Sequence, residues 1–137
     1  MGQGVDMTMY EFIKNHEDIE EYKCVVELTD MIMEADDITK PKNYSIITSI
    51  LLISTSYLNS LEKMIKEFIK NNPEEVKNRL LVGWTVEKDL NEHVENIHAL
   101  IECLRGDYYY YLDKPGKHWK WILDIIWYLK QPIKTLS

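Results

Sequence analysis

The sequence predicts an all-α protein, a compact bundle of five or six helices around a central Ser/Thr-rich apolar helix. Two observations carry this prediction. Apolar residues recur at spacings of three and four along most of the chain, which is the period of a helix with one buried side. Helix-capping residues, Pro and Gly divide these runs into segments. With 137 residues, 45% of them hydrophobic and 28% charged, one globular domain over residues 1–137 is expected.

The N-terminal part predicts a short helix followed by a longer one. Thr8 and Glu11 have the spacing of a capping box, so the short helix is expected to begin after Thr8. Asn15, which is followed by acidic residues, predicts a second helix start, and this helix is expected to run to about Ala35. Its apolar side is expected to consist of Ile19, Tyr22, Val25, Val26, Ile32 and Met33. Residues 1–8 are expected to be disordered or not to belong to the natural protein.

Residues 44–70 predict the central helix. The stretch 43–61 has no charged side chain, but seven of its nineteen residues are Ser or Thr. This polarity is too high for a membrane span and suits a helix surrounded by other helices. The stripe expected to face the core consists of Ile46, Ile50, Ile53, Tyr57, Leu61, Met64 and Phe68.

Two helices are expected in the region 72–106. Asn72 and Pro73 form a helix start, and Gly83 is expected to end this short helix. Thr85 is then expected to cap a long helix that ends near Gly106 and carries a regular apolar stripe.

The last helix is expected over residues 117–130. Its core side is expected to consist of Trp119, Ile122, Leu123, Ile126 and Leu129. Four consecutive tyrosines, 108–111, and the turn signature Pro115-Gly116 precede it. They leave open a hairpin that would pair the tyrosines with residues 118–122.

Charge is distributed unevenly along the chain. The formal net charge is -7, and residues 1–37 contain eleven acids but only two lysines. From Lys114 onward there are five lysines and one acid. The acidic N-terminal part is expected to repel nucleic acid and to attract a basic surface.

Cysteine usage and the N-terminus predict a cytoplasmic protein that does not enter a membrane. Cys24 and Cys103 are the only cysteines, and neither belongs to a Cys-x-x-Cys pair, so we expect reduced residues with structural roles. The N-terminus lacks the basic stretch and apolar run of a secretory signal peptide.

Chemical motifs are weak, and the sequence predicts a protein that is not an enzyme and has no catalytic residues, cofactor or metal. Glu95-Asn-Ile-His98 has the Glu-x-x-His spacing of di-iron carboxylate bundles, but the second such motif that this architecture requires is missing. There is also no Gly-x-Ser-x-Gly elbow and no Gly-rich phosphate loop. Exposed Glu and His side chains on a solvated helix face are therefore favoured.

One alternative is an all-α, Mg²⁺- or Mn²⁺-dependent nucleotide hydrolase that uses the N-terminal carboxylates. The all-α nucleotide pyrophosphohydrolases carry Glu-Glu-x-x-Glu on one helix and Glu-x-x-Asp on another. Here Cys24 occupies the position of the third Glu after Glu20-Glu21, and Glu27 and Asp30 follow too closely to lie on a separate helix. A solvated acidic face is favoured over a metal site.

A second alternative is nucleic-acid binding through residues 114–121, where lysines alternate with His118, Trp119 and Trp121. Aromatic and basic residues together can stack on single strands. The acidic net charge and the expected place of Trp119 in the core argue against nucleic acid as a partner.

The favoured hypothesis is a non-enzymatic protein-binding module, such as an inhibitor, immunity protein, antitoxin or adaptor. Its partner is expected to have a basic surface or to be a second copy of the chain, giving a homodimer. Fourteen lysines against two arginines, with many Ile and Asn residues, suggest a viral or phage protein or a low-GC bacterium. The predicted contact residues form an acidic helical face and a set of C-terminal aromatics: Glu17, Glu20, Glu21, Glu27, Asp30, Glu34, Tyr108, Tyr110, Trp121 and Tyr128.

Overall fold

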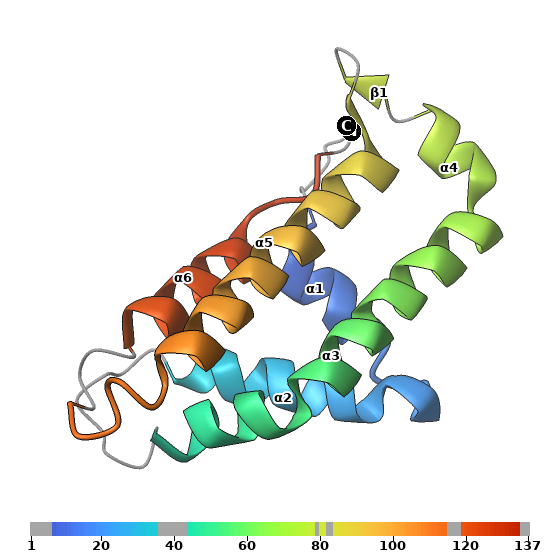
Figure 1. The fold of residues 1–137 in the computed structure, drawn as a ribbon. Helices are drawn as coiled ribbons and strands as arrows, with labels where there is room; N and C mark the ends of the chain where they lie inside the picture. The colour runs from blue at the N-terminus through green and yellow to red at the C-terminus, as the bar shows by residue number, and fades with distance from the viewer. Residues whose placement is uncertain (1–6, 36–43, 79, 82–83, 115–118, 135–137) are drawn as a thin grey trace.

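The computed structural model describes residues 7–35, 44–78, 80–81, 84–114 and 119–134 (Figure 1). These residues are almost entirely helical, which confirms the predicted all-α fold. The elements in chain order are α1 (Met9–Lys14), the 3₁₀ helix η1 (Glu20–Tyr22), α2 (Lys23–Glu34), α3 (Tyr44–Asn71), α4 (Pro73–Asn78), β1 (Leu80–Leu81), β2 (Trp84–Thr85), α5 (Val86–Asp107) and α6 (Trp119–Lys130).

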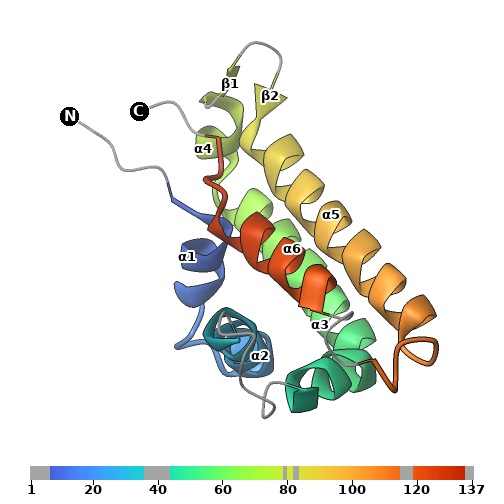
Figure 2. The same cartoon turned by 90° about the vertical axis from the view of Figure 1, so that its left-hand side faces the viewer.

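Helices α3, α5 and α6 determine the shape of the bundle. Helix α5 packs against α3 on one side and against α6 on the other. Helix α2 crosses this set at one end and contacts α3 and α6; it lies across the view in Figure 1 and is seen nearly end-on in Figure 2. Helix α1 packs on α2 and α6, and the short helix α4 contacts α3 and α5.

The core is formed mainly by aliphatic side chains from α1, α2, α3, α5 and α6. Their burial follows the helical period, because residues three and four apart share one face. The fully buried residues with large side chains include Met9, Ile13, Tyr22, Leu28, Ile32, Ile47, Ile50, Leu61, Met64, Ile65, Leu90 and Ile97. None of the described helices has the length and apolar character needed to cross a bilayer.

Polar side chains also connect α2 and its preceding turn to α3. The Thr29 and Tyr57 hydroxyls lie 2.9 Å apart in the core, and both side chains are buried. The hydroxyl of Tyr22 donates a hydrogen bond to Glu67, and an ion pair joins Glu21 to Lys63 at 2.9 Å. These contacts fix the register of α2 against α3.

The segments at the two ends of the described chain are hydrogen-bonded to each other through their backbones. The amide of Met9 donates to the carbonyl of Gln131 at 3.1 Å, and the amide of Ile133 donates to the carbonyl of Met7 at 2.7 Å. Thr8 and Pro132 form an antiparallel bridge between these contacts. Residues 7 and 8 therefore belong to the folded domain, whereas residues 1–6 lie outside the described part.

Most predicted helix boundaries are confirmed. The Thr8 hydroxyl accepts a hydrogen bond from the amide of Glu11, and the Thr85 hydroxyl accepts one from Lys88, as expected for helix N-caps. Helix α4 begins at Pro73, and α6 ends at Lys130, as predicted. The first two residues expected in the last helix, 117 and 118, lie outside the described part.

Two predicted boundaries are wrong. Asn15 ends α1 instead of starting the next helix, because its backbone amide bonds back to carbonyls of that helix. The helix expected to reach Gly83 ends at Asn78, and β1 pairs with β2 in a two-stranded antiparallel sheet that no sequence signal predicted. Gly83 itself is not among the described residues.

Several expected core residues are exposed, and on α3 and α6 other positions of the same helix are buried instead. Ile19 lies in the turn before η1 and is exposed, and so is Ile53, since α3 buries Ser54 instead. Leu123 of α6 is exposed, and Ile125 is buried. The hairpin considered above does not form in the described residues, because 108–113 are turns and 119–122 belong to α6.

The expectation that α3 is central and surrounded by other helices is not confirmed. Of its seven Ser and Thr residues in the charge-free stretch, Ser45, Thr48, Thr55 and Ser56 are exposed, and only Ser54 is buried. The side chain of Leu52 is also largely exposed. One side of α3 faces α2 and α5, and the other side is part of the molecular surface.

Candidate functional site

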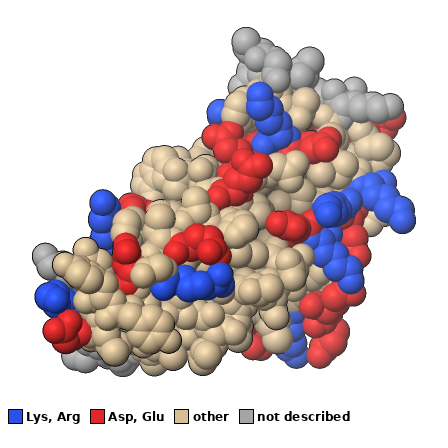
Figure 3. Space-filling model, viewed as in Figure 1, with Lys and Arg blue, Asp and Glu red and all other residues tan. Residues whose placement is uncertain are grey.

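The most exposed apolar side chains of the described residues border a groove between α3 and the end of α5. Leu52 is 79% exposed and Tyr109 is 82% exposed. Together with Thr48, Leu51, Arg105 and Tyr108 they line a cavity of about 260 Å³, which we call the tyrosine groove. Figure 3 shows few charged side chains over the first half of α3, where one wall of this groove lies. The groove is open and largely apolar, with dimensions that suit a side chain.

Arg105 brings a charge to the groove, and that charge is fixed and compensated. One guanidinium nitrogen donates to Glu102 at 2.6 Å, and another donates to the hydroxyl of Ser54 on α3. Ser54 is buried and donates in turn to the carbonyl of Leu51. Arg105 therefore joins α5 to α3 and closes the groove at one side, and it does not add a free positive charge.

The tyrosines lie on a tight turn that follows α5. The amide of Tyr111 bonds to the carbonyl of Asp107 at 3.0 Å, and the amide of Lys114 bonds to Tyr111 at 2.8 Å. The rings of Tyr108 and Tyr109 meet edge to face at 5.4 Å. The turn directs Tyr109 and Tyr110 outward, while Tyr108 packs on the core, so two of the four tyrosines remain largely exposed.

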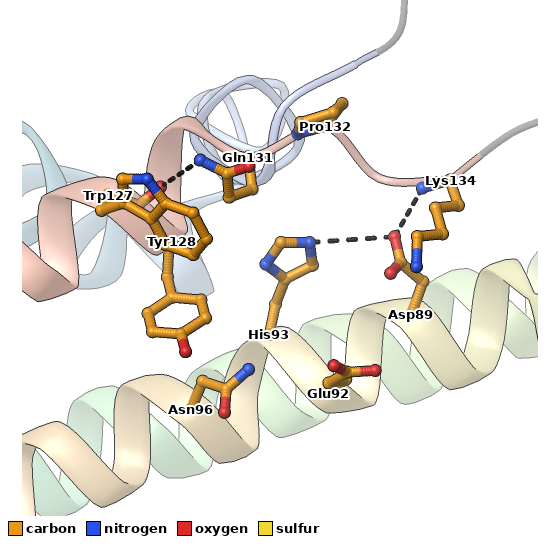
Figure 4. A pocket seen from close by; sticks show the side chains of 9 residues that line it. All are labelled: Asp89, Glu92, His93, Asn96, Trp127, Tyr128, Gln131, Pro132 and Lys134. Carbon is orange, nitrogen blue, oxygen red and sulfur yellow. Dashed lines mark hydrogen bonds and ion pairs between the residues drawn. The ribbon is translucent and has the colours of Figure 1, made fainter.

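A second cavity lies between α5, the end of α6 and the segment that follows α6 (Figure 4). Its volume is about 230 Å³, and we call it the histidine pocket. Its walls contain one exposed indole ring, a tyrosine, a proline and a set of polar side chains: Asp89, Glu92, His93, Asn96, Trp127, Tyr128, Gln131, Pro132 and Lys134.

Asp89 is a buried carboxylate with partners from three parts of the chain. Its side chain accepts a hydrogen bond from the indole nitrogen of Trp84 at 3.0 Å and another from the backbone amide of Lys134. The ring of His93, one helical turn along α5, lies 3.8 Å away. The ammonium groups of Lys88 and Lys134 lie 4.5 and 4.0 Å from the centre of the Trp84 ring. Asp89 therefore anchors the segment after α6 to the start of α5.

His93 is only 7% exposed, and its two ring nitrogens have different surroundings. Nε2 faces the carboxylate of Asp89, whereas Nδ1 is buried and has no hydrogen-bond partner among the described residues. In Figure 4 this nitrogen is on the side of the ring toward Asn96 and Tyr128. A buried ring nitrogen without a partner is uncommon, because an unsatisfied polar atom destabilises the fold.

Sequence reasoning missed the histidine pocket, although part of the signal was present. His93 is three residues after Leu90 and four before Ile97, which places it on the apolar stripe of α5. Asp89 is four residues before it, on the same side of the helix. Two ionisable residues on a buried helix face indicate a polar site, but Trp84 and Lys134 join it only through the fold.

The predicted acidic face is present only in part. Glu17, Glu20 and Glu21 are exposed and paired with Lys14, Lys23 and Lys63 at 3.4, 3.8 and 2.9 Å. Glu27 and Glu34 are exposed on α2. These pairs spread the negative charge and neutralise part of it.

Asp30 stabilises the packing of α1 on α2. It accepts hydrogen bonds from the Tyr10 hydroxyl at 2.6 Å and from the Lys14 ammonium at 2.8 Å. Burial raises the pKa of its carboxyl, but these hydrogen bonds outweigh burial and hold the pKa below its ordinary value. Asp30 is therefore engaged within the fold, and its role as a contact residue for a partner stays a prediction.

Of the predicted C-terminal aromatics, Tyr110 is largely exposed, whereas Tyr108, Trp121 and Tyr128 are half-buried. Trp121 and Tyr128 pack against the core, so this helix is covered on more than one side. The exposed aromatic of α6 is instead Trp127, at 56%. Lys120, Leu123, Trp127 and Lys130 form the exposed stripe of this helix.

In the part of the chain that the structure describes, the carboxylates and histidines of the metal-dependent alternatives do not form a metal-binding cluster. The His98 ring lies 3.7 Å from Glu102 on an exposed face of α5, and no three His, Cys, Asp or Glu side chains of the described part are placed to hold a metal ion together. Cys24 and Cys103 are both exposed, so burial does not support the structural role expected for them.

The Lys/Trp segment 114–121 is described only at its ends. Lys120 lies 5.3 Å from the ring centre of Trp121, which packs on the core. Residues 115–118 and the side chain of Trp119 lie outside the described residues. Of the aromatic rings expected to stack on nucleic acid, the ring of Trp121 is therefore partly buried.

No protein-family model, curated protein sequence or solved structure matches this chain.

Proposed function

We propose that this chain is a non-enzymatic protein-binding module whose partner inserts an apolar side chain into the tyrosine groove. The observation that carries the proposal is the exposure of Leu52 and Tyr109 on opposite walls of one groove. Water contact with a leucine side chain is unfavourable by about 1.5–3 kcal/mol relative to burial. Tyrosine is also among the residues that contribute most to protein interfaces.

The charge of the molecule favours one kind of partner. The net charge is -7, and the walls of the groove contain only the compensated charge of Arg105. A partner with a basic surface around an apolar anchor would be attracted at long range and then bound through apolar contact. An inhibitor, an immunity protein, an antitoxin or an adaptor would each be a module of this kind. Two exposed thiols, Cys24 and Cys103, fit a reducing compartment such as the cytoplasm.

The chain contains a matched control for the groove. Leu112 is 57% exposed on the same turn as the tyrosines, but it does not line the groove. Exchange of an exposed leucine for Asp changes the free energy of unfolding by less than about 0.5 kcal/mol. Leu52→Asp and Leu112→Asp should therefore fold equally well and differ only in partner binding.

The experiment compares proteins retained by the immobilised wild type, Leu52→Asp and Leu112→Asp from a host extract, followed by binding measurements with the purified partner. We expect one partner to bind wild type and Leu112→Asp and to be lost with Leu52→Asp. Sedimentation velocity of the same three proteins tests the homodimer. A partner that binds Leu52→Asp as tightly as wild type contradicts the use of the groove.

A further inference from the structure

The histidine pocket has the chemistry of a receptor for a hydrogen-bond donor. The carboxylate of Asp89, 3.8 Å from Nε2 of His93, favours a proton on that nitrogen. Nδ1 is then an acceptor that is buried and has no partner among the described residues. A group that reaches it from the pocket has to offer an N–H or O–H.

Other acceptors surround the same space. The amide nitrogen of Gln131 already donates to the carbonyl of Trp127 at 3.1 Å, which leaves its side-chain oxygen as an acceptor. Asn96 contributes another amide, and Glu92 an exposed carboxylate. A ligand with several donors fits this arrangement better than one with a single donor.

The sign of the charge in the pocket favours a cation. Asp89 and Glu92 are acidic, and the lining contains one lysine, Lys134, besides His93, which contributes Nδ1 as an acceptor. The ammonium group of Lys134 lies 4.0 Å from the ring centre of Trp84, and Figure 4 shows the Lys134 side chain beside Asp89, away from Trp127 and Tyr128. An anionic ligand would face the two carboxylates, whereas a cationic one would be attracted to them.

The aromatic side chains of the pocket favour a guanidinium group over an ammonium group. Trp127 is 56% exposed and meets the Tyr128 ring edge to face at 4.9 Å, so the indole is held in place at the pocket mouth. Planar guanidinium groups stack on such rings and present five donors, whereas an ammonium presents three on one atom. The cavity of about 230 Å³ is smaller than the roughly 300–1,000 Å³ of sites for drug-sized ligands. It matches one side chain.

We propose that the histidine pocket binds a guanidinium group, that of an arginine side chain on a protein partner, with Nδ1 of His93 as an acceptor and Trp127 as the stacking surface. The pocket chemistry stands independently of the tyrosine groove. The assignment of the guanidinium to a partner's arginine rests on the proposed function.

The test is a titration of the protein with N-acetyl-arginine amide, a blocked arginine, followed by NMR of the His93 ring nitrogens and the Trp127 indole. We expect saturable shifts at both side chains, with a dissociation constant on the order of 1 mM for a ligand of this size. N-acetyl-citrulline amide, which has the same shape but no charge, should cause no saturable shift. Equal shifts with both compounds, or none with the blocked arginine, overturn the proposal.

Two variants of α6 test whether the guanidinium group binds beside Trp127. Trp127→Ala should weaken binding about two- to fivefold, as expected for loss of one exposed cation–π contact. Leu123→Ala, an exposed residue on the same helix but outside the pocket, should bind like wild type. Equal affinity of the two variants overturns the stacking role.

Agmatine separates a free small cation from an arginine within a chain. If it binds and the blocked arginine does not, the partner's arginine is refuted as the source. Neither titration involves Leu52, so failure here leaves the groove proposal intact, and failure of the groove variants leaves this one intact.

Discussion

Replacement of Asp89 by Asn tests whether this carboxylate anchors the segment after α6. Asp89→Asn keeps the size of the side chain but removes its charge. The carboxylate accepts hydrogen bonds from the Trp84 indole and the Lys134 amide, whereas an amide side chain has one oxygen and turns an N–H toward the other donor.

The expected loss follows from these two hydrogen bonds. Hydrogen bonds to a charged acceptor contribute about 1.5–3 kcal/mol each, and a neutral one about 0.5–1.5 kcal/mol. The Asp89→Asn variant would retain one neutral bond and leave one buried donor without a partner. We therefore expect the free energy of unfolding to fall by about 3 kcal/mol, a large part of the roughly 5–15 kcal/mol typical of a domain.

Glu87→Gln is the matched control, because Glu87 is also an acid in the first turn of α5 but is exposed. It should lose only its interaction with the helix dipole, about 0.3–1 kcal/mol. Urea denaturation followed by circular dichroism measures both losses. Hydrogen exchange at the Lys134 amide shows whether the segment detaches locally. A loss for Asp89→Asn within about 1 kcal/mol of the control, with unchanged exchange at Lys134, refutes the anchoring role.

Further outcomes are expected elsewhere in the molecule. Tyr57→Phe leaves the buried Thr29 hydroxyl without its partner on α3, so the free energy of unfolding should fall by about 1–2 kcal/mol. A double-mutant cycle with Thr29→Val should show that the two losses are coupled, and additive losses contradict the pairing. Burial raises the pKa of Tyr57 in the folded protein to about 12, so as pH rises the unfolded chain loses this proton before the folded protein does. The free energy of unfolding should therefore fall between about pH 10 and 12, and it should fall less steeply in Tyr57→Phe. Because the pKa of Asp30 is lower in the folded protein, its ionised carboxylate stabilises the fold at neutral pH, and this stabilisation is lost as pH falls through that pKa. Asp30→Asn should remove this acid sensitivity, and Glu34→Gln should not. Mg²⁺ should leave the melting temperature unchanged, and a saturable rise would favour the hydrolase alternative.

Local signals explain why the helices were predictable. Thr8, Pro73 and Thr85 act through residues within one turn of themselves, so their effect on helix starts is encoded in adjacent sequence. The apolar stripe of α5 is likewise complete within one segment. These features required no knowledge of neighbouring helices.

Tertiary packing determined what the sequence could not predict. Ile53 and Ser54 are adjacent on α3, and the polar one is buried because Arg105 of α5 provides it with a hydrogen bond. From the sequence, Trp121 and Tyr128 were predicted to be the contact aromatics of α6, and Trp127 was not. All three are large aromatic residues on one helix, and only the position of the core shows that Trp127 is the exposed one. The candidate pockets combine residues distant in sequence, which periodicity cannot bring together.

The backbone pairing of residues 7–9 with 131–133 has a consequence for synthesis on the ribosome. Helix α1 is six residues long, too short to persist in water without packing. Helix α1 packs on α2, α3 and α6, and α6 is among the last parts of the described chain to emerge. Helix α1 is therefore expected to become ordered only after α6 has been translated, and until then the surface of α2 that it covers is open to chaperones.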